Sequence, residues 1–164
     1  MSGDESMASF TIGLDIMIVS ALVVGVARGF SVVLEEGMII DSLLHHSSVV
    51  LLELPKIAAA EGMLFFQTGL NFFIPSASGQ ALVSMPLMTP MADILGISRQ
   101  TAVVAYILGD GLSNLIIPTN GVLMAMLGLA KVSFEKWFKF VLPLFLISMV
   151  LALVFIALAV LIGY

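Results

Sequence analysis

Two groups of polar residues interrupt long apolar stretches of this sequence, and their types suit the binding of ions and small polar solutes. The first group surrounds a Pro/Ser/Gly run and comprises Asn71, Ser76, Ser78 and Gly79. The second group comprises Asp110, Ser113, Asn114, Thr119 and Asn120. Half-helices that end at membrane depth attract anions through free N–H groups, whereas free carbonyls with Ser, Thr and Asn oxygens suit sodium. Together these residues are the predicted substrate- or ion-binding site.

Asp110 is the most informative single residue of this set, because it carries a charge within an apolar segment. A carboxylate at the bilayer centre costs about 2.5–3.5 kcal/mol on insertion scales, so it normally faces a partner or a cavity. Three roles are open: ligand of a cation, carrier of a proton, or counter-charge to a cationic substrate. The simpler alternative is a capping residue for a helix that begins near Gly111.

Other chemistries find little support. The sequence contains no cysteine, which removes disulfides, thiolate metal sites and cysteine nucleophiles. His45 and His46 are adjacent and do not share a helix face, so they are interpreted as interfacial residues. No nucleophile with a plausible base is present, no basic patch for nucleic acid exists, and no resident cofactor or metal is expected beyond a transported sodium ion. We therefore expect a protein that is not an enzyme.

The composition indicates whether water or lipid surrounds the chain. The chain of 164 residues is 60% hydrophobic and 10% charged, with a net charge of −5. Soluble domains carry about 25% charged residues, so a chain with this composition has too few charged residues to cover its surface in water. The composition predicts an all-α integral membrane protein that crosses the membrane several times. The expected location is the cell (inner) membrane.

One transmembrane domain, residues 1–164, is expected. Residues 10–27 predict a membrane span that Arg28 closes at an interface. Residues 29–53 mix apolar side chains with acids and histidines, which is typical of a helix lying at the interface or packed against protein.

The two polar groups lie in segments that cannot be plain spans. Residues 56–92 predict a re-entrant hairpin, because the apolar arm after the tip, interrupted by Pro86 and Pro90, is too short to cross a bilayer. Residues 101–130 predict a broken span, with interruptions at 109–111, 113–114 and 118–121. Irregular backbone at membrane depth survives only where protein or water satisfies its polar groups, so each break is a candidate site.

The end of the chain predicts a loop followed by a span. Residues 131–139 are cationic and aromatic, and Trp137 suits the headgroup level. Residues 141–162 contain no charge and predict a lipid-facing closing helix.

Motifs at the two polar groups resemble a known family. The first motif runs from Asn71 through Pro75 to Gln80, and the second is Gly-Asp-Gly-Leu-Ser-Asn at 109–114 with Pro-Thr-Asn-Gly-Val-Leu-Met at 118–124. A Lys-Trp pair and Val-Leu-Pro at 141–143 follow. Together they resemble the YfcC-like branch of the C4-dicarboxylate anaerobic carrier family, most densely over residues 71–143.

The resemblance implies a fold and an activity. It implies one repeat of an inverted-repeat transporter, with a re-entrant hairpin and a broken helix, that works as a homodimer with an elevator-like motion. Related sodium symporters bind the ion and a substrate carboxylate at a Ser-Asn-Thr tip. The equivalent tip here is Ser76-Ala77-Ser78-Gly79, so Asn and Thr are replaced and the identity of the ion is in doubt. Family members are more than twice this long, which implies that the chain is a C-terminal half that pairs with a missing N-terminal half.

The leading hypothesis is an ion-coupled secondary transporter of small organic anions such as C4-dicarboxylates, or of amino acids, with sodium or a proton as the coupling ion. Asp110 slightly favours a cationic or zwitterionic substrate, because its carboxylate would repel a dianion. The alternative is a non-transporting membrane subunit or fragment that needs a separate N-terminal half, and a channel comes third. The expected partners are the lipid bilayer, a small-molecule substrate, and a second copy or the missing half.

Overall fold

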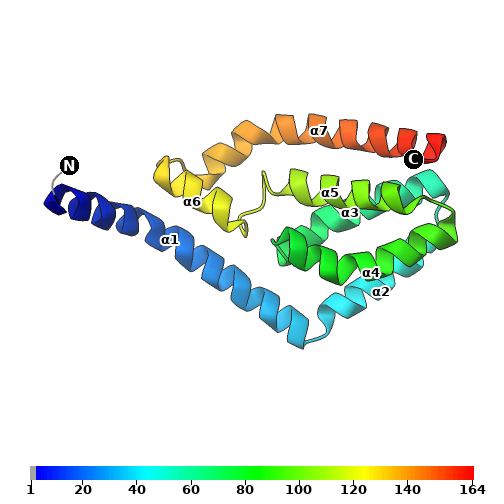
Figure 1. Ribbon diagram of the computed structural model, residues 1–164, viewed down its shortest axis with the longest axis horizontal. Coiled ribbons are helices and arrows are strands. Elements are labelled where there is room, and N and C mark those ends of the chain that lie inside the picture. The colour runs from blue at the N-terminus through cyan, green and yellow to red at the C-terminus, as the bar shows by residue number, and fades with distance from the viewer. Residues whose placement is uncertain (1–2) are drawn as a thin grey trace.

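The chain is helical throughout the part that can be described. This computed structural model describes residues 3–164, except for the side chains at positions 4, 5, 15–17, 19, 20, 23, 24, 27, 28, 30, 31 and 35. Within those limits the chain forms seven helices and no strand (Figure 1). Their bounds are α1 Gly3–Glu36, α2 Ile39–Leu52, α3 Lys56–Phe73, α4 Ala77–Leu95, α5 Arg99–Ser113, α6 Gly121–Leu129 and α7 Phe134–Ile162.

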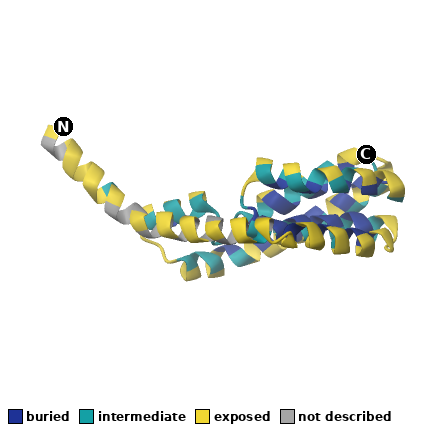
Figure 2. Cartoon of the chain, turned by 90° about the horizontal axis from the view of Figure 1, so that it is seen from below, coloured by how far each residue is buried: buried dark blue, intermediate teal, exposed yellow. Residues whose placement is uncertain are grey.

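Helices α3, α4, α5 and α7 form the core bundle. Helix α3 packs against α4, α5 and α7, and α2 covers α3 and α4 from one side. Fully buried alanines such as Ala59, Ala60 and Ala105 lie in this core, beside Met63, Leu64 and Met88. Small side chains let helix backbones approach closely where apolar surroundings give no other driving force. Buried residues concentrate in this bundle, whereas the far end of α1 is exposed (Figure 2).

The first two helices differ from the expected boundary. Helix α1 continues without interruption through position 29 to Glu36, so the boundary placed between residues 10–27 and 29–53 is wrong. The chain turns instead at Gly37 and Met38, where Met38 adopts a left-handed conformation with φ +52°. An Arg-Gly pair is tolerated inside a helix, whereas a residue at positive φ ends one. The side chains of Asp15 and Arg28 lie outside the described residues.

The segment predicted to form a re-entrant hairpin consists of two helices joined by a short break. Only residues 74–76 leave the helical conformation, and α4 begins at Ala77. The second arm is longer than expected, because α4 passes through Pro86 and Pro90 and continues to Leu95. The two prolines are one turn apart and both exposed, so their missing backbone hydrogen bonds fall on one outer face of the helix.

The predicted broken helix is also present, with a shorter break. Residues 114–120 interrupt the chain between α5 and α6, but Gly109, Asp110 and Gly111 are helical. The expected interruption at 109–111 is therefore wrong. Gly109 is required for packing rather than for a turn: an added Cβ would lie 2.7 Å from the Cβ of Gln67 and 2.9 Å from the carbonyl oxygen of Leu64 on α3.

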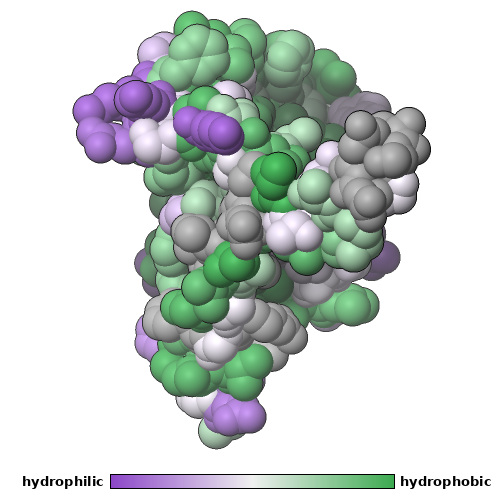
Figure 3. All heavy atoms as spheres, turned by 90° about the vertical axis from the view of Figure 1, so that its left-hand side faces the viewer, coloured by the Kyte–Doolittle hydropathy of each residue, from purple (hydrophilic) through white to green (hydrophobic). Residues whose placement is uncertain are grey.

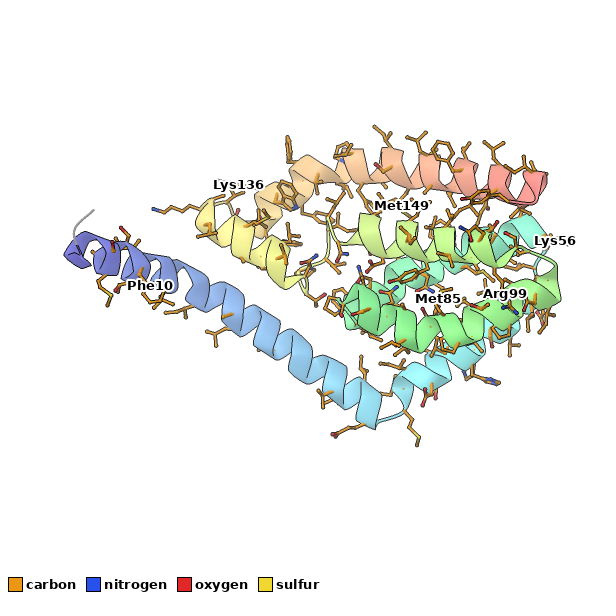
Figure 4. The ribbon with its side chains drawn as sticks, viewed as in Figure 1. Phe10, Lys56, Met85, Arg99, Lys136 and Met149 are labelled. Atoms are coloured by element: carbon orange, nitrogen blue, oxygen red, sulfur yellow. The ribbon has the colours of Figure 1, made fainter. Side chains whose placement is uncertain are left out.

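Helix α7 is the clearest membrane span. Among the described helices it alone is long and apolar enough to cross a bilayer, with a mean hydropathy of 3.2 over its best 18-residue window. It begins at Phe134, so Lys136, Trp137 and Lys139 lie in its first turns and the expected loop ends earlier than predicted. Its inner face includes Met149, which points toward the bundle (Figure 4).

The corner between α4 and α5 is held by polar contacts. Ser98 caps α5 by accepting a hydrogen bond from the Thr101 N–H, and Lys56 Nζ donates to the Gly96 carbonyl at 3.3 Å. Arg99 donates to both carboxylate oxygens of Asp93. These hydrogen bonds hold the pKa of the exposed Asp93 carboxyl below its usual value.

Candidate functional site

Asn71 joins the hairpin to the broken helix. It lies in the last turn of α3 and is completely buried. Its Nδ2 donates to the Asp110 carbonyl at 3.0 Å, to Ser113 Oγ at 2.8 Å and to Asn114 Oδ1 at 3.2 Å. Its own Oδ1 is buried and has no hydrogen-bond donor among the described residues. One amide therefore secures the end of α5 and leaves an acceptor oxygen available.

The end of α5 presents a second set of polar groups. Ser113 is fully buried, and its Oγ donates to the Gly109 carbonyl at 2.6 Å. The carboxylate of Asp110 accepts a long hydrogen bond of 3.5 Å from Asn114 Nδ2. Asp110 is 8% exposed and takes part in none of the ion pairs found among the described side chains. Because Asp110 is inside α5, its predicted alternative role as an N-cap is wrong.

The break at 114–120 is tied to both of its helices. Asn120 Oδ1 accepts from the N–H groups of Val122 and Leu123, which caps α6. Its Nδ2 donates to Asn114 Oδ1 at 2.8 Å. Asn71 also donates to that oxygen, so Asn114 Oδ1 is the point at which α3, α5 and α6 meet.

Two further contacts place the break beside the hairpin tip. Thr119 Oγ1 donates to the Phe72 carbonyl at 3.1 Å, at the end of α3. Tyr106 Oη donates to the Ala77 carbonyl at 2.6 Å, at the start of α4. The N-terminus of α4 and the 114–120 break consequently lie on the same side of the bundle (Figure 1).

The tip residues themselves are more open. Ser76 caps α4 and accepts a hydrogen bond of 3.4 Å from the Gly79 N–H, while Ser78 is exposed in the first turn. Within the described contacts, no hydrogen bond links Ser76, Ser78 or Gly79 to the 110–120 group. The structure therefore gathers Asn71 with the second group and leaves the tip serines facing outward beside it.

A third polar group was missed by the sequence reasoning. Gln80 Nε2 donates to Gln67 Oε1 at 2.7 Å and to the Gln67 carbonyl at 2.9 Å, and Gln67 Nε2 donates to Ser84 Oγ at 2.9 Å. All three side chains are buried between α3 and α4. Their spacing was the available signal, since Gln67 and Asn71 on α3, like Gln80 and Ser84 on α4, are four residues apart and share a helix face.

Trp137 also has a role that its sequence position did not indicate. Its Nε1 donates to the Leu115 carbonyl at 2.9 Å, so α7 holds one of the free carbonyls of the break. The indole is half-buried.

The arrangement brings groups of opposite charge preference to one side of the bundle. The N-termini of α4 and α6 provide partial positive charge, whereas Asp110 and the free Asn71 oxygen favour a cation. Among the described residues no three His, Cys, Asp or Glu side chains are grouped to hold a metal.

Comparison with known proteins identifies the family. The sequence profile named "C4-dicarboxylate anaerobic carrier" matches residues 1–161. The chain is 39% identical over 144 residues to an Escherichia coli K12 protein named "Putative basic amino acid antiporter YfcC", covering 85% of this chain and 28% of that protein. An uncharacterized protein of Haemophilus influenzae Rd is 38% identical over 144 residues, covering 88% and 28% of the two chains. No solved structure matches. The chain thus spans about 28% of the length of these relatives, and it belongs to the C4-dicarboxylate anaerobic carrier family of transporters.

Proposed function

We propose that this chain supplies the substrate- and ion-binding part of an ion-coupled secondary transporter that crosses the inner membrane several times. The observation that carries the proposal is the convergence on Asn114 Oδ1, where Asn71 and Asn120 both donate. Two interrupted helices held together by amide side chains are the kind of element from which secondary transporters build their binding sites. The residues assigned to the site are those predicted from the sequence: Asn71, Ser76, Ser78, Gly79, Asp110, Ser113, Asn114, Thr119 and Asn120.

Asp110 favours a substrate with a cationic amino group. Its carboxylate is buried and has no Lys, Arg or His partner among the described side chains. An unpaired carboxylate repels a dicarboxylate dianion and attracts an ammonium group. The name of the E. coli relative refers to basic amino acids, which agrees with this reading. Sodium or a proton is the proposed coupling ion, with Asn71 Oδ1 and the tip hydroxyls as candidate sodium ligands.

Substrate binding by the purified full chain tests the assignment. We expect labelled lysine or arginine to bind better than succinate or fumarate, and Asp110→Asn to weaken binding of the basic amino acids at least tenfold. Asp93→Asn is the matched control, because Asp93 is an exposed carboxylate paired with Arg99. Equal loss in both variants, or unchanged binding in Asp110→Asn, would show that Asp110 does not contact the substrate.

A second candidate function rests on chain length. Because the chain spans about 28% of its relatives, it can be a non-transporting subunit that becomes active with a second copy or with a separate N-terminal half. Uptake into proteoliposomes distinguishes the two. Uptake by the chain alone supports the carrier, whereas uptake only after co-expression with the missing part of a relative supports the subunit.

A further inference from the structure

The junction between α6 and α7 contains a cavity on the far side of the 114–120 break. Its volume is about 460 Å³. Its walls are apolar side chains of α6 together with Val132 and the indole of Trp137, and only Asn114 and Asn120 at its inner end are polar. Such a lining suits a hydrocarbon chain rather than an amino acid or a dicarboxylate.

Cationic residues adjoin the lining residues of this cavity in the sequence. Three of the six Lys and Arg residues of the chain, Lys131, Lys136 and Lys139, fall within nine positions, although the whole chain has a net charge of −5. Lys139 pairs with Glu135 at 2.6 Å, whereas Lys131 and Lys136 have no acidic partner among the described residues. Figure 4 shows Lys136 extending away from the junction, and Figure 3, which faces this end of the molecule, shows a hydrophilic patch bordering a largely hydrophobic surface.

We propose that this junction binds an anionic phospholipid. One acyl chain fills the α6–α7 cavity against Trp137, and the phosphate lies between the ammonium groups of Lys131 and Lys136. Charge complementarity supports this occupant, because two lysines without an acidic partner among the described residues flank the lining of an apolar cavity. The lining also includes an aromatic residue of the kind that lies at headgroup level. Because Trp137 also donates to the Leu115 carbonyl, the lipid would contact the residue that holds the broken helix.

Trp137 is the single tryptophan of the chain, so its fluorescence reports on this site directly. The experiment uses the full chain in bilayers containing trace brominated phosphatidylglycerol or brominated phosphatidylcholine, since bromine quenches an indole only on contact. A preference of about fivefold per lysine is expected, so half-maximal quenching should need about 25-fold less of the anionic lipid. The Lys131→Gln/Lys136→Gln double variant should lose this preference. Lys56→Gln should retain it, because Lys56 lies at the opposite end of the bundle (Figure 4).

Three outcomes would overturn the proposal. Equal quenching by both lipids would show that the cavity takes any acyl chain. A preference that survives in the double variant would show that these lysines do not select the headgroup. Absence of quenching by either lipid would show that protein, such as a second copy or the remainder of the carrier, covers the cavity.

Discussion

Asn71 has an unusual position for an amide, because it is fully buried and yet reaches three acceptors that all belong to the end of α5. Without Asn71, the buried Ser113 Oγ would have no donor among the described residues, whereas the Asp110 carbonyl and Asn114 Oδ1 would keep their other donors. In an apolar environment each unsatisfied polar group is costly. The side chain therefore acts as the link between the hairpin and the broken helix.

The first prediction at the residue scale concerns this link. Asn71→Ala should lower the free energy of unfolding in detergent by about 1–3 kcal/mol, because it leaves the buried Ser113 Oγ without a donor and removes the hydrogen bonds that join α3 to the end of α5. Thr68→Ala is the control, since the Thr68 hydroxyl bonds only to the Leu64 carbonyl of its own helix and should matter little. Thermal unfolding monitored by circular dichroism measures both. Equal stabilities would mean that Asn71 does not hold α5.

Residue types in the sequence identified many members of the candidate site, but the sequence did not show which of these residues contact one another. The motif at 109–114 identified Asp110, Ser113 and Asn114, and the structure places them beside Asn71; whether they bind a substrate stays a prediction. Gln67, Gln80 and Ser84 were missed, because a glutamine in an apolar helix can face lipid, water or a partner and only packing decides between these. The hydrogen bond of Trp137 was missed because its partner, the Leu115 carbonyl, is distant in the sequence.

At the element scale, the sequence predicted which helices are interrupted better than where each interruption lies. The hairpin and the broken helix both exist as helix–break–helix units. Their breaks are shorter than predicted, because prolines on an exposed face and glycines in a close contact were both read as helix breakers. Gly109 faces the backbone of α3, while Pro86 and Pro90 face outward. A helix interior accepts either residue when packing compensates for it.

This distinction gives a prediction for two glycines on the same helix. Gly109→Ala should destabilise the protein by about 1–3 kcal/mol, because the new methyl group would push α5 away from Gln67 and Leu64 on α3. Gly111→Ala meets no atom within 4 Å and should be neutral or stabilise by up to about 1 kcal/mol through helix propensity. Unfolding in detergent measures the difference. Two variants of equal stability would contradict the close approach of α3 and α5.

At the scale of the whole molecule, the arrangement of helices leaves large apolar surfaces uncovered. Helix α1 diverges from the bundle and packs mainly against α6, and side chains such as Phe10 and Leu22 are more than half exposed (Figure 1). Many side chains of α7 also face outward. Composition predicted this surface, since a chain with 10% charged residues cannot cover itself with polar groups. What covers it, lipid or the rest of a carrier, depends on molecules beyond this chain.

The depth of the hairpin tip follows from the same whole-molecule reasoning and can be measured, because the chain lacks cysteine. If the tip lines an aqueous cavity inside the membrane, Ser78→Cys should react with a charged, membrane-impermeant thiol reagent in intact membranes. Ile147→Cys, exposed on the apolar middle of α7, should stay unlabelled, and Gln100→Cys at the α4–α5 corner should react fastest. All three should label equally after denaturation in detergent, which controls for expression. Backbone outside helices is tolerated at membrane depth only where water or protein satisfies its polar groups. If Ser78→Cys is labelled as little as Ile147→Cys, lipid or protein covers the tip, and the proposed solute pathway lies elsewhere.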